Sequence, residues 1–369
     1  MTKWTKFLSH RRWRVGLSLG LLTAGLVWLL LPASLRDEAR RRDEVGDEVL
    51  QGLVPGLGRM TLTLRAGGSI WGNAFCQQDG TRYSLTGNDD QGRVQVDLVA
   101  ADHLTTNGSL TLNWVRPPAA FIGGSWQAAK GGPAVPVKFQ RVAQMWRRHR
   151  FRPLSIATAG VRVTEWTSYP VFPGGWQMDQ ISRELRRGWW RSERDPATSF
   201  YWGAVNLVRD LFESEAFEPV DLGRTTEVLF VSDKLVSIFT RADTAVMLDS
   251  ATRREMWNYV IEKGHARRFG LAELFRPGTP WEERLSALCL EQLGPLPEQA
   301  NVQSLSAKQM AEFAVLPGGV MIQFDPYGFG VGADNDYHVV IPWARLQGLL
   351  DPNGPARVIR SASCVTPGA

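Results

Sequence analysis

The pattern of hydrophobic and polar positions changes along this chain. Residues 15–33 are apolar and carry no charge, whereas residues 59–142 alternate apolar and polar side chains in short runs separated by turn residues. From Trp166 onward, some apolar residues recur every second position and others every third or fourth. The pattern predicts an apolar helix, then a β-rich region, then a region of mixed α and β structure.

The apolar run of residues 15–33 is about as long as a helix needs to be to cross a bilayer. It follows five basic residues and no acidic one, and it is longer than the core of a cleaved signal peptide. Four arginines also follow it, so the positive-inside count is close and the orientation rests on the short tail. We expect an uncleaved signal anchor in the inner (cytoplasmic) membrane, with residues 1–14 cytoplasmic and the bulk in the periplasm or outside the cell. A cleaved segment is the alternative.

Residues 34–58 have the mixed charge of a polar stalk with some helical character. Beyond them, residues 59–142 show turn signals every 8 to 12 residues, which is typical of a small antiparallel β-barrel or curled sheet. Glycines that recur among these strands would permit bends and close backbone contacts. They are Gly72, Gly87, Gly108 and Gly124.

Residues 143–165 are predicted to be a linker, and they contain a basic cluster. That cluster suits either contact with anionic lipid head groups or polymer, or a solvated connector. Residues 166–352 are predicted to form an α+β domain with an antiparallel sheet, and residues 353–369 a loose tail. Within the domain, Met178, Ile181 and Leu185 have helical spacing, and residues 227–231 and 234–240 indicate a hairpin.

Two capping boxes are expected in the second half of the chain. Thr279 stands before Pro280 and three residues before Glu282, which predicts a helix start. Ser306 and Gln309 have the spacing of a second capping box. Strands are expected over 320–324 and 337–341, followed by a short helix.

The net charge of +5 belongs to the first fourteen residues. Five of the 42 basic residues lie there, which leaves 37 basic against 37 acidic residues in the rest of the chain. Proteins that bind nucleic acid carry a basic face. A charge-balanced ectodomain therefore gives no support to a nucleic-acid partner.

The chain has three cysteines, Cys76, Cys289 and Cys364, whose spacing matches no metal site. In an oxidising compartment a disulfide between Cys289 and Cys364 is possible, and free thiols are the alternative. The five histidines form no ligand pair, so we expect no metal and no cofactor.

Residues 313–328 contain the segment FAVLPGGVMIQFDPYG, and residues 339–343 read VVIPW ahead of a leucine-rich stretch. Together with residues 259–275, these segments resemble an extracytoplasmic domain of unknown function. That domain is found at the outer end of lysozyme-sensing anti-sigma factors and beside peptidoglycan deacetylase domains as a non-catalytic partner. The β-rich region is similar to a glycine-punctuated β module that often precedes it.

The chain departs from this family at residues 241–248, which lack the Gly-Gly-x-His segment of many members. The metal motifs of the deacetylase catalytic domain are absent as well. The resemblance therefore implies binding without catalysis. We expect a non-enzymatic protein, although an envelope hydrolase or deacetylase with an unrecognised site, or a structural subunit of an envelope assembly, is an alternative.

Two groups of residues are candidate binding surfaces, for a lysozyme-like protein or for cell-wall peptidoglycan. Aromatic side chains beside arginines have the composition of interface hot spots and of sugar-stacking surfaces, and core packing is the other explanation. The first group is Arg187, Trp189, Trp190, Arg191, Tyr201 and Trp202. The second is Asp325, Tyr327 and Tyr337, in the loop between the two predicted strands.

Overall fold

The computed structural model describes ten stretches of the chain between Glu44 and Val358. They are residues 44–65, 69–90, 92–100, 105–114, 120–156, 159–192, 220–246, 249–294, 302–325 and 337–358. The predicted spanning segment, residues 15–33, and the predicted tail, residues 1–14, lie outside these stretches. Within the described stretches, no helix has the length and apolar character required to cross a membrane.

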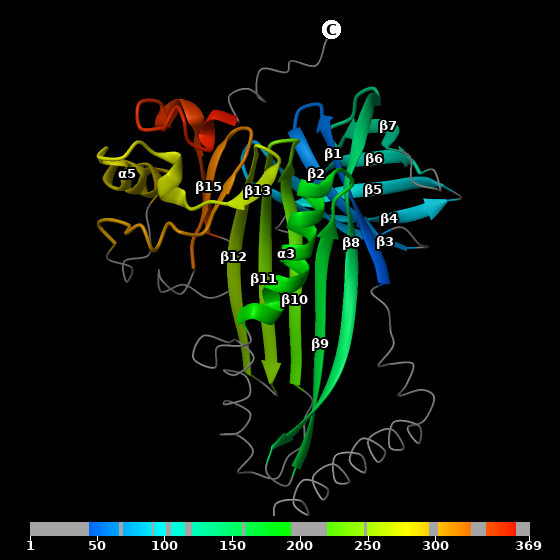
Figure 1. The fold of residues 1–369 in the computed structure, drawn as a ribbon. Coiled ribbons are helices and arrows are strands. Elements are labelled where there is room, and N and C mark those ends of the chain that lie inside the picture. Colours follow the sequence, from blue (N-terminus) through cyan, green and yellow to red (C-terminus); the bar gives the residue numbers. More distant parts are fainter. Residues whose placement is uncertain are drawn as a thin grey trace, which may run out of the picture.

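Eight antiparallel strands form a closed barrel (Figure 1). Each strand pairs with the next one along the chain, and β1 also pairs with β8, which closes the ring. The antiparallel barrel predicted from the sequence is thus confirmed. Its strands are β1 (Glu44–Val54), β2 (Gly58–Arg65), β3 (Ser69–Cys76), β4 (Arg82–Asp90), β5 (Arg93–Ala100), β6 (Thr106–Asn113), β7 (Phe121–Ala128) and β8 (Val135–Ile156).

The barrel encloses its own apolar core. Alternate residues of its strands point inward and pack together, among them Leu62, Leu85 and Phe139. The glycines let neighbouring backbones approach closely: a Cβ on Gly72 would lie 2.1 Å from the carbonyl oxygen of Thr63. Such contacts allow a small barrel to curve tightly, as the recurrence of glycine predicted.

The prediction of a helical stalk over residues 34–58 is wrong for the described part, because β1 starts at Glu44. Register shifts interrupt the pairing of β1 with β8. As a result, the consecutive residues Val49 and Leu50 are both fully buried, in different cores. These irregularities hide the two-residue period of the strand.

A long extension of the sheet leaves the barrel through β8. Residues 143–165, predicted to be a linker, lie in β8 and in β9 (Ala159–Val171), which pair from Gln144 to Ile156. The sheet continues through β10 (Val220–Val231), β11 (Leu235–Val246), β12 (Asp249–Glu262) and β13 (His265–Arg268). The predicted hairpin is confirmed as β10 and β11, joined by the turn at residues 232–234.

Helix α3 (Trp176–Ser192) covers one face of this extension (Figure 1). Its residues Ile181 and Leu185 pack on Val228, Ile238 and Tyr259 of the sheet, as the helical spacing predicted. The segment between β9 and β10 contains this helix, and β9 pairs with β10 in parallel, whereas the other pairings among the described strands are antiparallel.

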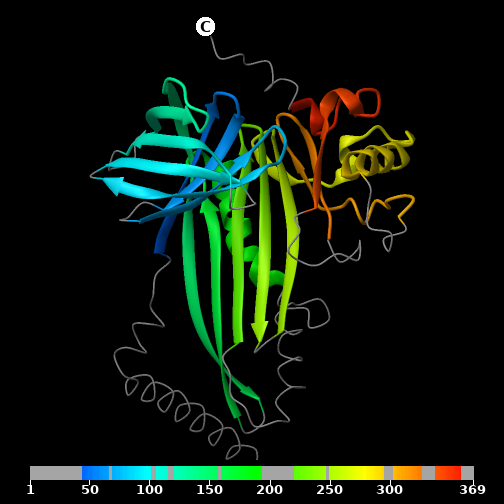
Figure 2. The same ribbon diagram turned by 180° about the vertical axis from the view of Figure 1, so that it is seen from behind.

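The C-terminal part covers the opposite face of the extension (Figure 2). Its three-stranded sheet packs with a helix and two 3-10 turns onto Phe230 and Val260, and Phe75 of the barrel joins the same core. The predicted strands near 320–324 and 337–341 are confirmed, each shifted by one residue. The elements are η1 (Leu271–Leu274), α5 (Trp281–Leu293), β14 (Phe313–Val315), β15 (Gly319–Gln323), β16 (His338–Pro342) and η4 (Trp343–Leu346).

The described protein is therefore mostly β, with fewer helices than an α+β class implies. Two local predictions fail in detail. Helix α5 takes Pro280 as its N-cap, with no side-chain cap, and the Thr279 hydroxyl donates instead to the carbonyl of Arg276. The tail predicted to be loose begins packed, because Ala356 and Val358 are buried in the C-terminal core.

Candidate functional site

The aromatic and arginine cluster predicted around α3 lies outside the described side chains. Four of its members belong to α3 by their backbone alone, and two lie beyond the helix, outside the described residues. The four are Arg187, Trp189, Trp190 and Arg191, and the two are Tyr201 and Trp202. The cluster remains a prediction.

The structure brings together two of the three residues of the other predicted surface. The carbonyl of Tyr337 accepts hydrogen bonds from the backbone N–H of Phe324 at 2.8 Å and from Nε2 of Gln323 at 3.0 Å. Asp325 follows directly, so it lies beside Tyr337 where β15 ends and β16 begins. Asp325 is exposed and Tyr337 is half-buried against the C-terminal core. Tyr327 lies outside the described residues.

Cys289 is a free, buried thiol on α5, and Cys364, its predicted partner, lies outside the described residues. Burial raises the pKa of Cys289 to about 12. Cys76, at the end of β3, is also free and buried, and burial raises its pKa to about 11. Thiols with raised pKa values are poor nucleophiles, so neither cysteine has the environment of a reactive one.

An exposed indole on the outer wall of the barrel was not among the predicted site residues. Trp71 lies near the start of β3 and is 66% exposed, more than any other large hydrophobic side chain in the described part. Its neighbours Ile70 and Ala74 are buried in the barrel core. Trp71 therefore stands on the outward phase of the strand.

Polar side chains surround Trp71 on the same face of the sheet. Trp71 is directly opposite Arg65 of β2 and Thr86 of β4, and Thr86 is opposite Asp97 of β5. Directly opposite residues of antiparallel strands place their side chains on one face, about 5 Å apart. All four side chains are exposed. We call the outward positions of β2–β5 the Trp71 face; further exposed members are Ser69, Asn73, Asn88 and Gln95.

Inward glycines bring the strands of the Trp71 face close together. A Cβ on Gly72, next to Trp71, would meet the backbone of β2, and a Cβ on Gly87, next to Thr86, would lie 1.9 Å from the carbonyl oxygen of Gln95. Both glycines fall in the inward phase. The outer side chains are consequently held on a continuous backbone surface, where an apolar ring lies among hydroxyl, amide and carboxylate groups.

Charged side chains lie along one edge of the Trp71 face. Arg65 lies 3.9 Å from Asp47 of β1, and the same carboxylate accepts a hydrogen bond from Nη2 of Arg147 at 2.9 Å. The Asp47 side chain is 17% exposed and is therefore partly shielded from solvent. The Arg65 side chain remains 55% exposed beside the indole.

The other end of the same barrel wall is covered. The hydroxyl of Thr61 on β2 donates to the carbonyl of Leu229 at 2.8 Å, and Nε2 of Gln77 donates to the Thr61 hydroxyl at 2.8 Å. A register shift in β10 occurs at Leu229. This buried network fixes the barrel against the extended sheet and leaves the Trp71 end facing solvent.

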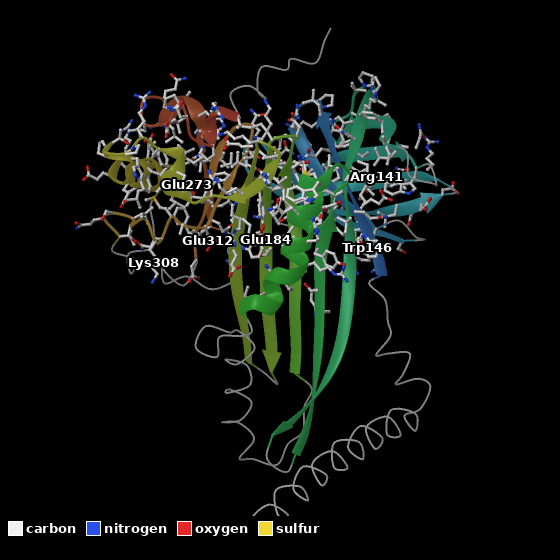
Figure 3. All side chains as sticks on the ribbon, in the orientation of Figure 1. Arg141, Trp146, Glu184, Glu273, Lys308 and Glu312 are labelled. Carbon is white, nitrogen blue, oxygen red and sulfur yellow. The ribbon has the colours of Figure 1, made fainter. Side chains whose placement is uncertain are left out.

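Aromatic and arginine side chains also meet beneath α3, where they are packed. The guanidinium carbons of Arg224 and Arg268 lie 4.9 Å and 4.2 Å from the ring centre of Trp257. Trp257 is 7% and Arg224 6% exposed. Glu184 of α3 lies beside these strands (Figure 3). Burial and the Glu184 carboxylate raise the pKa of Tyr259. This group closes the contact between helix and sheet and offers little surface to a ligand.

Among the described residues, no group of three or more histidine, cysteine, aspartate or glutamate side chains is arranged to hold a metal ion. The chemistry available on the Trp71 face is stacking, hydrogen bonding and charge pairing. These are the means of reversible recognition.

No family profile and no curated protein matches the chain. The solved structures to which it is similar in part include the following two. One is a member of the DUF3298 family from Bacteroides fragilis, with a TM-score of 0.41 and 12% identity over 59% of this chain and 98% of that one. The other is a DUF3298 family protein from Pseudomonas aeruginosa, with a TM-score of 0.37 and 19% identity over 57% of this chain and 94% of that one.

DUF3298 is a family of domains of unknown function, and a domain of unknown function is what the sequence motifs resemble. Neither of these two proteins is described as an anti-sigma factor or a deacetylase.

The alternation of residues in the sequence indicates that Trp71 is exposed. In residues 69–74, Ser69, Trp71 and Asn73 share one phase of the alternation, and Ile70 and Ala74 the other. An aromatic residue in the polar phase of a half-buried strand points to solvent. The phase of this strand therefore identifies Trp71 as a candidate from the sequence.

Proposed function

We propose that this protein is a membrane-anchored periplasmic binding protein that recognises a cell-wall glycan on the Trp71 face, without catalysis. The observation that carries the proposal is the exposure of Trp71, 66%, in the middle of a polar sheet surface. Anchorage by residues 15–33 and location outside the inner membrane come from the sequence and belong to the same proposal.

The indole supplies the apolar part of such a contact. A pyranose ring has one face of C–H groups, and this face packs flat against an aromatic ring. Covering one face of an indole removes roughly 100 Å² of apolar surface, which favours binding by about 2–3 kcal/mol before the cost of ordering the sugar.

The cross-strand neighbours supply the polar part. Asp97 accepts hydrogen bonds from sugar hydroxyls, Thr86 both donates and accepts, and Arg65 suits the carboxylates of peptidoglycan stem peptides. Strand spacing places these groups within the width of one or two sugar rings of the indole, at about 5 Å per strand. A continuous surface of this kind fits an extended chain of sugars.

Cosedimentation of the purified full-length protein, in detergent, with insoluble peptidoglycan sacculi tests the proposal. We expect W71A to weaken binding at least tenfold, because the stacking surface is lost while the side chain contributes little to the fold. W176A is the matched control: Trp176 is also exposed, at 53%, but lies in the first turn of α3 against His265.

Equal binding by wild type and W71A would overturn the assignment of the Trp71 face. Failure of the wild-type protein to sediment with sacculi, together with retention on immobilised lysozyme, would replace the glycan with a protein ligand. Loss of binding in W176A alone would move the site to α3.

A further inference from the structure

The β8–β9 hairpin projects out of the sheet as a two-stranded ribbon (Figure 1). The pairing of β8 with β1 ends at Arg147, opposite Glu44, and β9 pairs with β10 only over residues 163–167. Beyond those positions β8 and β9 pair with each other as far as Ile156 and Ala159. We call residues 148–156 and 159–162 the β8–β9 ribbon.

A two-stranded ribbon is marginally stable in water by itself. The described strands on either side of the β8–β9 ribbon, β1 and β10, end before its tip. Within the described stretches, neither of these strands reaches the outer end of the ribbon, and a further contact would stabilise that end.

The sequence of the ribbon changes from basic at its root to apolar at its tip. Residues 147–165 contain five arginines and one glutamate, Glu165, which is opposite Arg150 in the register. Along β8, alternate positions from root to tip read Arg148, Arg150, Arg152, Leu154 and Ile156.

The outer positions of β9, the partner strand, are apolar as well. Val163 is opposite Arg152, Val161 is opposite Leu154, and Ala159 is opposite Ile156. On this side of the ribbon, the β8 positions near the sheet are thus basic, and the positions of both strands away from the sheet are apolar. This gradient matches the boundary of a bilayer, where anionic head groups lie outside the hydrocarbon.

The N-terminal segment enters the fold at the root of the ribbon. Glu44 is opposite Arg147, and β1 runs antiparallel to β8, so the N-terminal end of β1 points in the direction of the ribbon tip. The nine residue steps along the strand from Arg147 to Ile156 rise about 30 Å. The ten residues 34–43 span at most about 35 Å when extended. The tip and the predicted exit of the membrane anchor can therefore lie at the same level.

We propose that the β8–β9 ribbon rests its tip in the interface of an anionic bilayer and places its arginines among the lipid phosphates. The inference rests on the proposed anchorage by residues 15–33 and is independent of glycan binding. Each arginine near an anionic surface adds to the attraction between the ribbon and the lipid phosphates. The contact would hold the barrel at a fixed height above the membrane.

An environment-sensitive NBD fluorophore on the ribbon tests this contact in the full chain. S155C, in a C364S background, is labelled and reconstituted into nanodiscs with or without phosphatidylglycerol. Cys76 and Cys289 are buried, so they compete little for the label. K130C is the matched control, because the exposed Lys130 lies between β7 and β8, at the opposite end of β8 from the tip.

We expect the S155C label to shift to the blue and brighten at least twofold in anionic nanodiscs, and the K130C label to stay unchanged. R148Q/R150Q/R152Q should abolish the shift. An aqueous spectrum for S155C in a chain that stays in the nanodisc would overturn the ribbon inference and leave anchorage intact. An equal shift with soluble polyphosphate and neutral lipid would also overturn it. A chain that does not stay in the nanodisc would refute the anchorage and the inference with it.

Discussion

At the scale of single residues, two barrel glycines differ in the space available for a side chain. A Cβ on Gly87 would lie 1.9 Å from the carbonyl oxygen of Gln95, whereas a Cβ on Gly123 would have no atom within 4 Å. We expect G87A to lower the free energy of unfolding by about 3 kcal/mol, because two strands must separate, and G123A to change it by less than about 0.5 kcal/mol. Urea titration measures both, and equal stabilities would contradict the close approach.

The buried thiols make stability depend on alkaline pH. Burial raises the pKa of Cys289 from 9.0 to about 12 and that of Cys76 from 9.0 to about 11. Above pH 9 the unfolded chain loses thiol protons that the native chain keeps, so this contribution is complete below pH 9 and disappears between about 9 and 12. We expect the stability of the wild type to fall more steeply over this range than that of C289A. Parallel urea titrations at pH 8 and 10.5 measure the difference, and identical slopes would contradict it.

Which residues matter was only partly visible in the sequence. The backbone role of the barrel glycines could be predicted, because glycine recurs among the short strands. The composition of the sequence favours tryptophans that stand beside arginines over Trp71. The contacts of Trp257 with Arg224 and Arg268 show that this composition also occurs in packed contacts. Composition alone does not separate a surface from a core; the phase of the strand does.

At the scale of elements, the side-chain amide of Gln180 protects a sheet edge. Nε2 of Gln180 donates to the carbonyl of Ala266 at 3.0 Å, and its Oε1 accepts from the Ala266 N–H at 3.4 Å. The amide thereby acts as a substitute for a neighbouring strand along β13. Strand edges without such cover expose unpaired backbone groups.

We expect Q180A to lower stability by about 1 kcal/mol and to speed hydrogen exchange at the amide of Ala266. R183A is the control, because Arg183 is exposed one turn further along α3 and its Nε bonds the carbonyl of Asp179 in its own helix. Hydrogen exchange by mass spectrometry measures both variants. Unchanged exchange over β13 in Q180A would contradict its role as an edge cover.

Strands with a regular two-residue period were predicted well, and irregular or basic ones were not. β5 alternates buried and exposed positions over residues 93–98, and β3 keeps the same period over residues 69–74; the sequence located both strands. β1 was missed because its register shifts put Val49 and Leu50 side by side in two cores. The middle of β8 was missed because a run of arginines is typical of a solvated segment, whereas here pairing with β9 holds it extended.

At the scale of the whole molecule, β8 joins the barrel to the extended sheet without a break. One continuous strand of 22 residues pairs with β7 and β1 in the barrel and with β9 in the extension. The barrel wall also contributes Phe75 to the C-terminal core. Closure of the ring and this sharing of a strand are long-range pairings, which local sequence patterns do not specify.

We therefore expect the described part of the molecule to unfold in a single cooperative step. Far-UV circular dichroism and tryptophan fluorescence in urea should give coincident transitions. Two separate transitions would favour the division into independent domains that a linker at residues 143–165 predicts.

The measurement that tests the central claim most directly is the dissociation constant of soluble peptidoglycan chains for wild type, W71F and W71A, determined by calorimetry on the full-length protein. Recognition by stacking on the Trp71 face predicts the tightest binding for the wild type, intermediate binding for W71F, and at least tenfold weaker binding for W71A, or about 1.4 kcal/mol. Equal constants for the three proteins, with their folds intact, would contradict it.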